Sequence, residues 1–300
     1  MAACSKDDAT ADDDTQQAIA FEASTSVFRT RSIISSNTDL QAASGFGVFA
    51  YYTEDVAWAN TTNPTPDFMY NQQVTYSTDH WTYTPVKYWP NNSGHKVSFF
   101  AYAPHNGNGI TAGHDNTTKQ AIITYTWGTT NDLLFDNSTT NRDLTKPDIS
   151  ATVPFTFRHA VANVEFKVRR KEQTGSTITL HSLTVDSDAN TAGTFNLVTG
   201  NWTAQTGNDA QPLNYSTPDL NVTGYDDTTA QTIGSSIMMP GTWTFQYTID
   251  YTIGTDDYTP LPKSLSPIAM EMGHRYTVVF VIDGDVVESY VLREREAEQW

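Results

Sequence analysis

Two arginines near the amino end are suited to one chemical event, cleavage of the chain. Arg29 and Arg31 follow a short apolar stretch at residues 19–28 and precede a polar stretch at residues 35–38. A trypsin-like protease cuts after a basic residue where the backbone is exposed. The pair is therefore a candidate protease site. The alternative is two ordinary, solvated loop arginines.

The only cysteine of the chain, Cys4, is the second residue with chemical potential. It follows Ala2 and Ala3, and residues 5–17 are small, polar and acidic. Small residues before a cysteine are typical of the end of a lipoprotein signal peptide, where that cysteine is acylated. We therefore expect residues 1–17 to be a disordered lipoprotein tether, held on a membrane through acyl chains such as palmitate. The alternative is an incidental thiol in a polar tail.

The motifs of common enzymes are missing. No His-Glu-x-x-His, Gly-x-Ser-x-Gly or Gly-x-x-x-x-Gly-Lys occurs, and the 7 histidines lack ligand spacing. His159 is expected at a sheet edge or in a loop. Asn131, Asp132, Asp136 and Asn137 could offer oxygens to calcium, but without the EF-hand pattern. We predict no enzyme activity, no metal and no cofactor, with a β-sandwich hydrolase as the enzyme alternative.

Aromatic residues are concentrated between positions 81 and 90. Trp81 and Trp89 are candidate stacking surfaces for a glycan, because aromatic rings present flat apolar faces. The alternative, which the sequence favours, is that these rings fill the core of a β domain or cover its edge.

Charge narrows the range of partners. The chain carries 17 Lys and Arg against 34 Asp and Glu, a net charge of −17. Such a surface repels phosphate backbones and anionic lipid headgroups, so we expect no nucleic-acid partner. No apolar run reaches the ~18 residues that a membrane-spanning helix needs. A single cysteine also excludes a disulfide within the chain.

Short apolar runs separated by turn residues predict an all-β chain. Its 15 Tyr, 14 Phe and 7 Trp are strand-favouring residues. Residues 45–52 and 97–102 are predicted core strands, and residues 68–76 a hairpin around positions 71–73. Residues 243–253 alternate as one long amphipathic strand, and residues 286–292 follow an Asp-Gly turn at 283–285. A polar, proline-containing stretch at residues 136–147 predicts a domain boundary, which gives domains 18–145 and 146–300.

The order of these motifs resembles the Mfa-like branch of the fimbrillins, the type V pilus subunit lipoproteins of Bacteroides-type bacteria. The resemblance covers residues 19–300 and rests on many short motifs in sequence order. The motifs in the first half are Gly45-Phe-Gly-Val-Phe-Ala-Tyr51, Trp81-x-Tyr83-x-Pro85 and Val97-x-Phe-Phe-Ala-Tyr-Ala-Pro104, and those in the second half include Val153-x-Phe155-x-Phe157, Met239-Pro240 and Gly273-x-x-Tyr276.

The resemblance implies a fold and a mode of assembly. Members have two tandem transthyretin-like β-sandwich domains and are exported as outer-membrane lipoproteins. An arginine-specific protease removes their first strand, and a C-terminal segment of a neighbouring subunit fills the vacated groove. Here the removed strand would be residues 19–28, with cleavage after Arg29 or Arg31. The donor segment would be residues 286–300, with the apolar side chains Val286, Val287, Tyr290 and Leu292.

The end of that donor segment departs from a simple stalk subunit, because residues 293–298 are strongly charged. The main hypothesis is therefore a cell-surface fimbrial subunit or adhesin whose partners are other pilus subunits. The alternative is a surface lipoprotein that binds a glycan or host ligand without polymerising.

Overall fold

The computed structural model describes residues 16–25, 34–147, 149, 151–207, 213–215, 219–259 and 261–295. These residues form the strands of five β-sheets. Helical structure among them is limited to α1 (Asn37–Ala42) and the 3-10 turns η1 (Trp58–Asn60) and η2 (Thr139–Asn141). The prediction of an all-β chain is confirmed.

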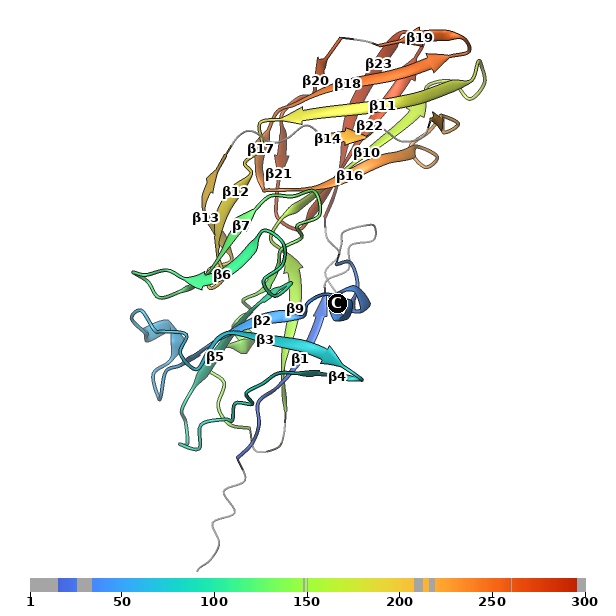
Figure 1. The fold of residues 1–300 in the computed structure, drawn as a ribbon. Helices are drawn as coiled ribbons and strands as arrows, with labels where there is room; N and C mark the ends of the chain where they lie inside the picture. The colour runs from blue at the N-terminus through green and yellow to red at the C-terminus, as the bar shows by residue number, and fades with distance from the viewer. Residues whose placement is uncertain are drawn as a thin grey trace, which may run out of the picture.

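A seven-stranded sheet forms the lower half of the molecule in Figure 1, in the order β1-β9-β8-β5-β2-β3-β4. Its strands β2 and β5 are almost continuously apolar, because both faces of the sheet are buried. Phe46, Val48 and Ala50 face one core cluster, and Phe49 and Tyr51 face another. The strands are β1 (Ala20–Thr25), β2 (Phe46–Tyr52), β3 (Met69–Ser77), β4 (His80–Thr82), β5 (Val97–Ala103), β8 (Leu134–Asp136) and β9 (Thr152–His159).

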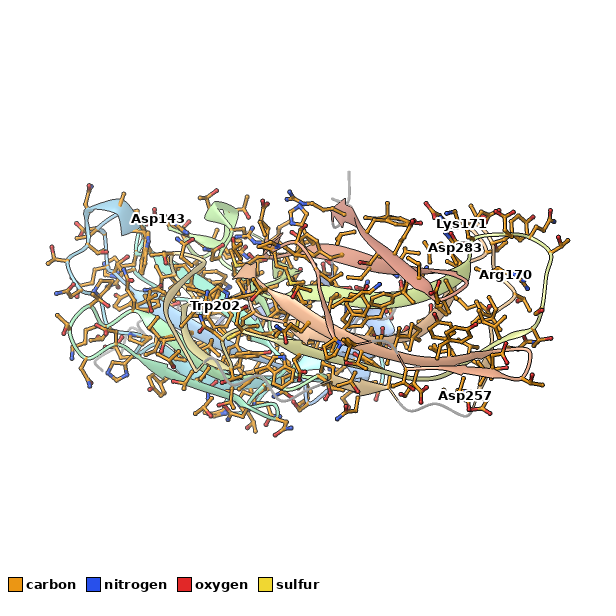
Figure 2. All side chains as sticks on the ribbon, turned by 90° about the horizontal axis from the view of Figure 1, so that it is seen from above. Asp143, Arg170, Lys171, Trp202, Asp257 and Asp283 are labelled. Carbon is orange, nitrogen blue, oxygen red and sulfur yellow. The ribbon has the colours of Figure 1, made fainter. Side chains whose placement is uncertain are left out.

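A four-stranded sheet covers the second of those faces, in the order β13-β12-β7-β6. Trp202 packs with Tyr125 and Phe195 of the same sheet, and its indole donates to the backbone carbonyl of Ala160 over 2.8 Å. Trp202 lies between the two ends of the molecule in Figure 2. The strands are β6 (Ile110–His114), β7 (Ala121–Thr126), β12 (Ala192–Asn196) and β13 (Asn201–Thr206).

The upper half is a sandwich of a four-stranded sheet, β16-β10-β22-β23, and a six-stranded sheet built on β14-β11-β18-β19. Alternate residues of β10, β11, β18 and β22 share one core cluster, as period-2 strands packed face to face require. The strands are β10 (Ala162–Arg170), β11 (Ile178–Ser187), β14 (Leu213–Tyr215), β15 (Leu220–Asn221), β16 (Gln231–Met238), β18 (Phe245–Ile253), β19 (Asp256–Tyr258), β20 (Lys263–Ser264), β22 (His274–Asp283) and β23 (Val286–Arg295). A separate pair joins β17 (Gly241–Trp243) and β21 (Ile268–Met270).

Strand pairing crosses the predicted domain boundary. Strand β9 follows residue 145 but pairs with β8 and β1, and β12 pairs with β7. A cut at residue 145 would therefore divide two sheets. The division into domains 18–145 and 146–300 stays a prediction.

Two local predictions were wrong. Residues 69–77 form one strand and not a hairpin. In place of the expected turn, Asn71 is a single left-handed residue (φ 47°) within the strand, next to a register shift in the pairing of β2 with β3. The expected strand 243–253 breaks at Thr244, whose backbone N–H and hydroxyl both donate to the carboxylate of Asp188. The Asp-Gly turn was right, since Asp283 pairs with Val286 in the β22–β23 hairpin.

Candidate functional site

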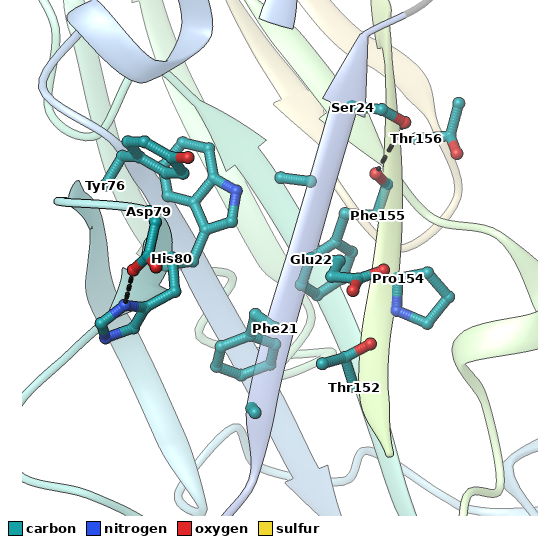
Figure 3. Close-up of a pocket in the computed structure, with 13 residues that line it drawn as sticks. Phe21, Glu22, Ser24, Tyr76, Asp79, His80, Thr152, Pro154, Phe155 and Thr156 are labelled. Atoms are coloured by element: carbon teal, nitrogen blue, oxygen red, sulfur yellow. Dashed lines mark hydrogen bonds and ion pairs between the residues drawn. The ribbon is translucent and has the colours of Figure 1, made fainter.

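Strand β1 is the edge strand that precedes the predicted cleavage site. It runs parallel to β9, with Phe21 opposite Val153 and Ala23 opposite Phe155. On its other side it lies beside β4 (Figure 3). An edge strand has one paired side only, and parallel pairing is slightly weaker per residue than antiparallel pairing. Strand β1 is thus held less by backbone pairing than a central strand is.

The side chains of β1 bind it firmly to the core instead. Ile19, Phe21 and Thr25 point inward and expose 3% of their surface or less, whereas Glu22 is exposed. Four rings of the described residues surround that of Phe21, at centroid distances between 5.3 and 6.3 Å; the ring of Phe155 is stacked on it. We call this surrounding the aromatic slot, made of Phe46, Tyr83, Phe99 and Phe155.

Hydrogen bonds hold the amino end of β1. The hydroxyl of Tyr83 donates to the carbonyl of Ile19 over 2.8 Å, and the N–H of Ile19 donates to the carbonyl of Lys87 over 2.9 Å. The N–H of Trp89 donates to the carbonyl of Gln17 over 2.9 Å. Burial raises the pKa of the Tyr83 hydroxyl, so the hydroxyl stays protonated and able to donate.

Helix α1 holds the other end. The N–H of Thr25 donates to the side-chain oxygen of Asn37 over 2.9 Å. Ser36 caps the helix by accepting from the N–H of Asp39, and its own hydroxyl donates to the Asp39 carboxylate. These hydroxyl donors, from Ser36 first and Ser35 second, lower the pKa of Asp39. The short helix is thereby fixed where Asn37 can hold the end of β1.

A buried histidine–carboxylate pair lies between β9 and the residues that precede α1. Nδ1 of His159 lies 2.7 Å from Oδ1 of Asp132, and Oδ2 of Asp132 accepts from the N–H of Ile34 over 3.3 Å. The expectation that His159 lies at a sheet edge or in a loop was wrong, because its side chain is fully buried on β9. In the sequence, only the alternation of Phe155 and Phe157 with polar residues indicated that His159 is buried. This alternation places residue 159 on the same inward face as the two rings.

The residues considered as calcium ligands form hydrogen bonds with the backbone of neighbouring segments. Asp136 accepts from the N–H groups of Ser138 and Thr156, and Asn131 donates to the carbonyl of Thr126. Within the described residues, no three His, Cys, Asp or Glu side chains gather as a metal site would require.

The two tryptophans considered for glycan stacking lie in different surroundings. Trp81 lines an open groove of about 420 Å³ between β1 and β4, together with Tyr76, His80 and Glu22 (Figure 3). Its ring packs on Phe46 and Tyr76 at 4.9 and 5.2 Å. Trp89 is 4% exposed and packs on Phe99. The structure therefore does not bring the two rings together as one platform.

The predicted donor residues lie on β23, the edge strand of the upper sandwich. Val286 and Leu292 are exposed, Tyr290 is half-buried and Val287 is buried in the core. Every residue of β23 pairs antiparallel with β22. Donation of this segment would thus require its release from its own sheet.

Three sites of the prediction, Cys4, Arg29 and Arg31, lie outside the described residues. In the part of the chain that is described, no helix has the length and apolar character to cross a membrane.

Comparison with known proteins decides the family. Residues 30–300 match the fimbrillin-like family. The chain belongs to this family. It is 32% identical over 209 residues to the fimbrium subunit Fim1C of Phocaeicola vulgatus, a match that covers 64% of the chain and 55% of that relative. The chain thus spans little more than half the length of the curated relative that it matches.

Solved structures of similar fold extend the likeness over nearly the whole fimbrillin-like chain. A fimbrial protein from Bacteroides vulgatus superposes with a TM-score of 0.73 at 22% identity, over 94% of this chain and all of the other. A candidate cell adhesion protein from Bacteroides ovatus gives 0.56 at 16% identity, over 95% and 99% of the two chains. At these identities the likeness shows a shared fold.

Proposed function

We propose that this fimbrillin-like chain is a cell-surface fimbrial subunit or adhesin that assembles by strand exchange at β1. The observation that carries the proposal is the position of β1. It is a parallel edge strand whose apolar face fills the core, and it precedes the segment with Arg29 and Arg31. Family membership supports the same reading.

Cleavage in that segment would change how β1 is attached. A cut after Arg29 or Arg31 leaves β1 joined to residues 1–19 and no longer joined to α1. Among the described residues, the strand would then be held by its pairing with β9, its end hydrogen bonds and the burial of its inward side chains. Its loss would expose the apolar residues of the slot, and an extended strand of a neighbour could cover them by β-augmentation.

The remaining roles follow the same scheme. Cys4 would anchor the precursor in the outer membrane through acyl chains, an arginine-specific protease would make the cut, and other pilus subunits would supply the strand. Residues 286–300, with Val286, Val287, Tyr290 and Leu292, would serve as this chain's donor segment once β23 separates from β22.

The test is digestion of the folded full-length chain with an arginine-specific protease. We expect a new amino terminus at Thr30 or Ser32, followed by exchange of the freed β1 for an added peptide of residues 16–26. The matched control carries Arg29→Lys and Arg31→Lys, which keep the charge but remove the arginine sites. Resistance of the wild-type segment while other arginines are cut would contradict the proposal. A cut protein that exchanges β1 for no added peptide would do so as well.

A second candidate is a surface lipoprotein that binds a glycan or host ligand and does not polymerise. The observation that favours it is the groove between β1 and β4, where the Trp81 and Tyr76 rings lie beside the polar side chains of Glu22 and His80. Such a mixture of rings and polar groups suits a sugar. Unlike strand exchange, this function needs β1 in place.

A further inference from the structure

The inward face of β1 has a definite pattern of side-chain size. Ile19, Phe21, Ala23 and Thr25 point to the same side, because side chains alternate along a strand. One large ring enters the aromatic slot, a branched aliphatic residue precedes it by two positions, and two smaller residues follow it. The pattern is therefore Ile-x-Phe-x-Ala-x-Thr.

Of the four inward positions of β1, the position of Phe21 is the most selective for the type of side chain, because that side chain enters the aromatic slot. The Phe21 ring meets rings from β2, β5 and β9 and from the segment after β4. Small side chains would leave an empty space there, and polar ones would lose their hydration.

The chain's own β23 fits this pattern poorly. One face carries Val287, Ser289, Val291 and Arg293, which include no ring. The opposite face carries Tyr290, but Glu288 lies two positions away on that same face. With Tyr290 in the slot, the Glu288 carboxylate would occupy the place of Ile19 in one strand direction and that of Ala23 in the other.

Both places disfavour a carboxylate. Ile19 is 2% exposed, and Ala23 packs against the same core cluster. A charge buried without a partner is strongly disfavoured. In its own sheet Glu288 is exposed, so its charge is solvated there. The conflict arises only if this segment enters the place of β1.

We infer that the place of β1 selects its replacement through the aromatic slot, and that its partner is a strand of a different subunit with the Ile-x-Phe-x-Ala-x-Thr pattern, not β23 of a second copy. This inference rests on the proposed function and names the partner that the function leaves open. It predicts mixed assembly at this site, with the chain unable to polymerise efficiently with itself.

The test uses the full chain with the recognition sequence of a site-specific protease inserted between residues 28 and 29, so that it does not depend on Arg29 or Arg31. After the cut, a fluorescent peptide of residues 16–26 replaces β1, and unlabelled peptides compete with it. The competitors are residues 16–26, the same peptide with Phe21→Ala, a matched control with Glu22→Ala, residues 286–300, and residues 286–300 with Glu288→Ala.

We expect Phe21→Ala to weaken competition by ~100-fold or more, as removal of a buried ring does, and Glu22→Ala to change it less than ~3-fold. The 286–300 peptide should compete at least ~100-fold more weakly than residues 16–26, and Glu288→Ala should improve it ~10-fold or more. Equal competition by the Phe21→Ala peptide would overturn the inference that the slot selects a ring. Equal competition by the unaltered 286–300 peptide would overturn the choice of partner.

Failure of the proposed function has a different signature, namely that no peptide of any sequence enters the cut protein. The slot is then tested in the same protein by the urea concentration that releases β1. Phe21→Ala must lower that concentration and Glu22→Ala must leave it unchanged; otherwise the inference fails as well.

Discussion

The imidazole of His159 and the carboxylate of Asp132 lie 2.7 Å apart, and their side chains expose 0% and 1% of their surface. The second oxygen of Asp132 accepts from the backbone of Ile34. One carboxylate thus connects β9 to Ile34, which precedes α1 in the chain. This arrangement fixes the path of the chain close to the predicted cleavage segment.

Loss of this carboxylate should destabilise the fold. We expect Asp132→Ala to lower the free energy of unfolding by about 2–4 kcal/mol, because it removes two buried hydrogen bonds, one to His159 and one to the N–H of Ile34. Urea unfolding followed by tryptophan fluorescence measures the change. The matched control is Asp79→Ala, which removes an exposed pair with His80 of similar length, 2.8 Å, and should have little effect. Equal losses in the two variants would refute the expected dependence on burial.

The ring of Phe21 should be the main anchor of β1 in the intact chain. Phe21→Ala should lower the free energy of unfolding by about 3–5 kcal/mol, the usual loss for a buried phenylalanine. Glu22→Ala, one residue away on the exposed face, should change it by less than about 0.5 kcal/mol. Chemical denaturation of both variants checks the difference, and a small effect of Phe21→Ala would show that β1 contributes little to the core.

The hydroxyl of Tyr83 should give β1 a sensitivity to alkaline pH. Burial raises its pKa above the ordinary value of about 10, so the folded chain keeps this proton at pH values where the unfolded chain has lost it. Its contribution to stability is therefore complete below pH 10 and is lost as the pH rises through the folded-state pKa.

The comparison variant for that prediction is Tyr83→Phe. At pH 7 it should be about 1 kcal/mol less stable than the wild type, because the hydrogen bond to Ile19 is missing. As the pH rises above about 10, the wild type should lose more stability than the variant, so the gap should close. Denaturation at a series of pH values measures it, and a constant gap would mean that Tyr83 does not titrate differently in the folded chain.

The two tryptophans offer a test of the glycan alternative. If a glycan binds in the groove between β1 and β4, Trp81→Ala should abolish binding on a glycan array and leave most of the stability intact. Trp89→Ala should instead lower the stability by about 3–5 kcal/mol, because this residue is buried. Array binding that survives Trp81→Ala would place any glycan site elsewhere.

Acylation at Cys4 remains a prediction with a simple measurement. Expressed behind a lipoprotein signal peptide in a suitable host, the chain should incorporate labelled palmitate and partition into detergent. Cys4→Ser should do neither. Equal labelling of the two proteins would show that the thiol is not the attachment point.

The sequence was sufficient to predict those strands and turns that depend on a local pattern of residues. Apolar runs such as residues 45–52 become central strands because both of their faces are buried, and the Asp-Gly turn before Val286 forms the expected hairpin. Alternation in the strand up to His159 also placed Phe155 and Phe157 inward.

Contacts between distant segments decided the rest. The break at Thr244 depends on Asp188, and the burial of His159 depends on Asp132; neither partner is adjacent in sequence. The aromatic slot likewise joins Phe21 to rings from four separate segments. A single sequence shows which of these residues are apolar or polar but does not show which of them meet.

The parallel pairing of β1 with β9 has a consequence for how each molecule is made. More than a hundred residues separate Thr25 from Thr152, so closing this contact is entropically slow compared with closing a hairpin. During synthesis β1 emerges first, yet its pairing partner does not exist until about half of the chain has followed. The aromatic slot is also incomplete until then, because the ring of Phe155 lies on β9. In that interval the ring of Phe21 has no complete slot to enter, so it stays available for contacts with other apolar surfaces.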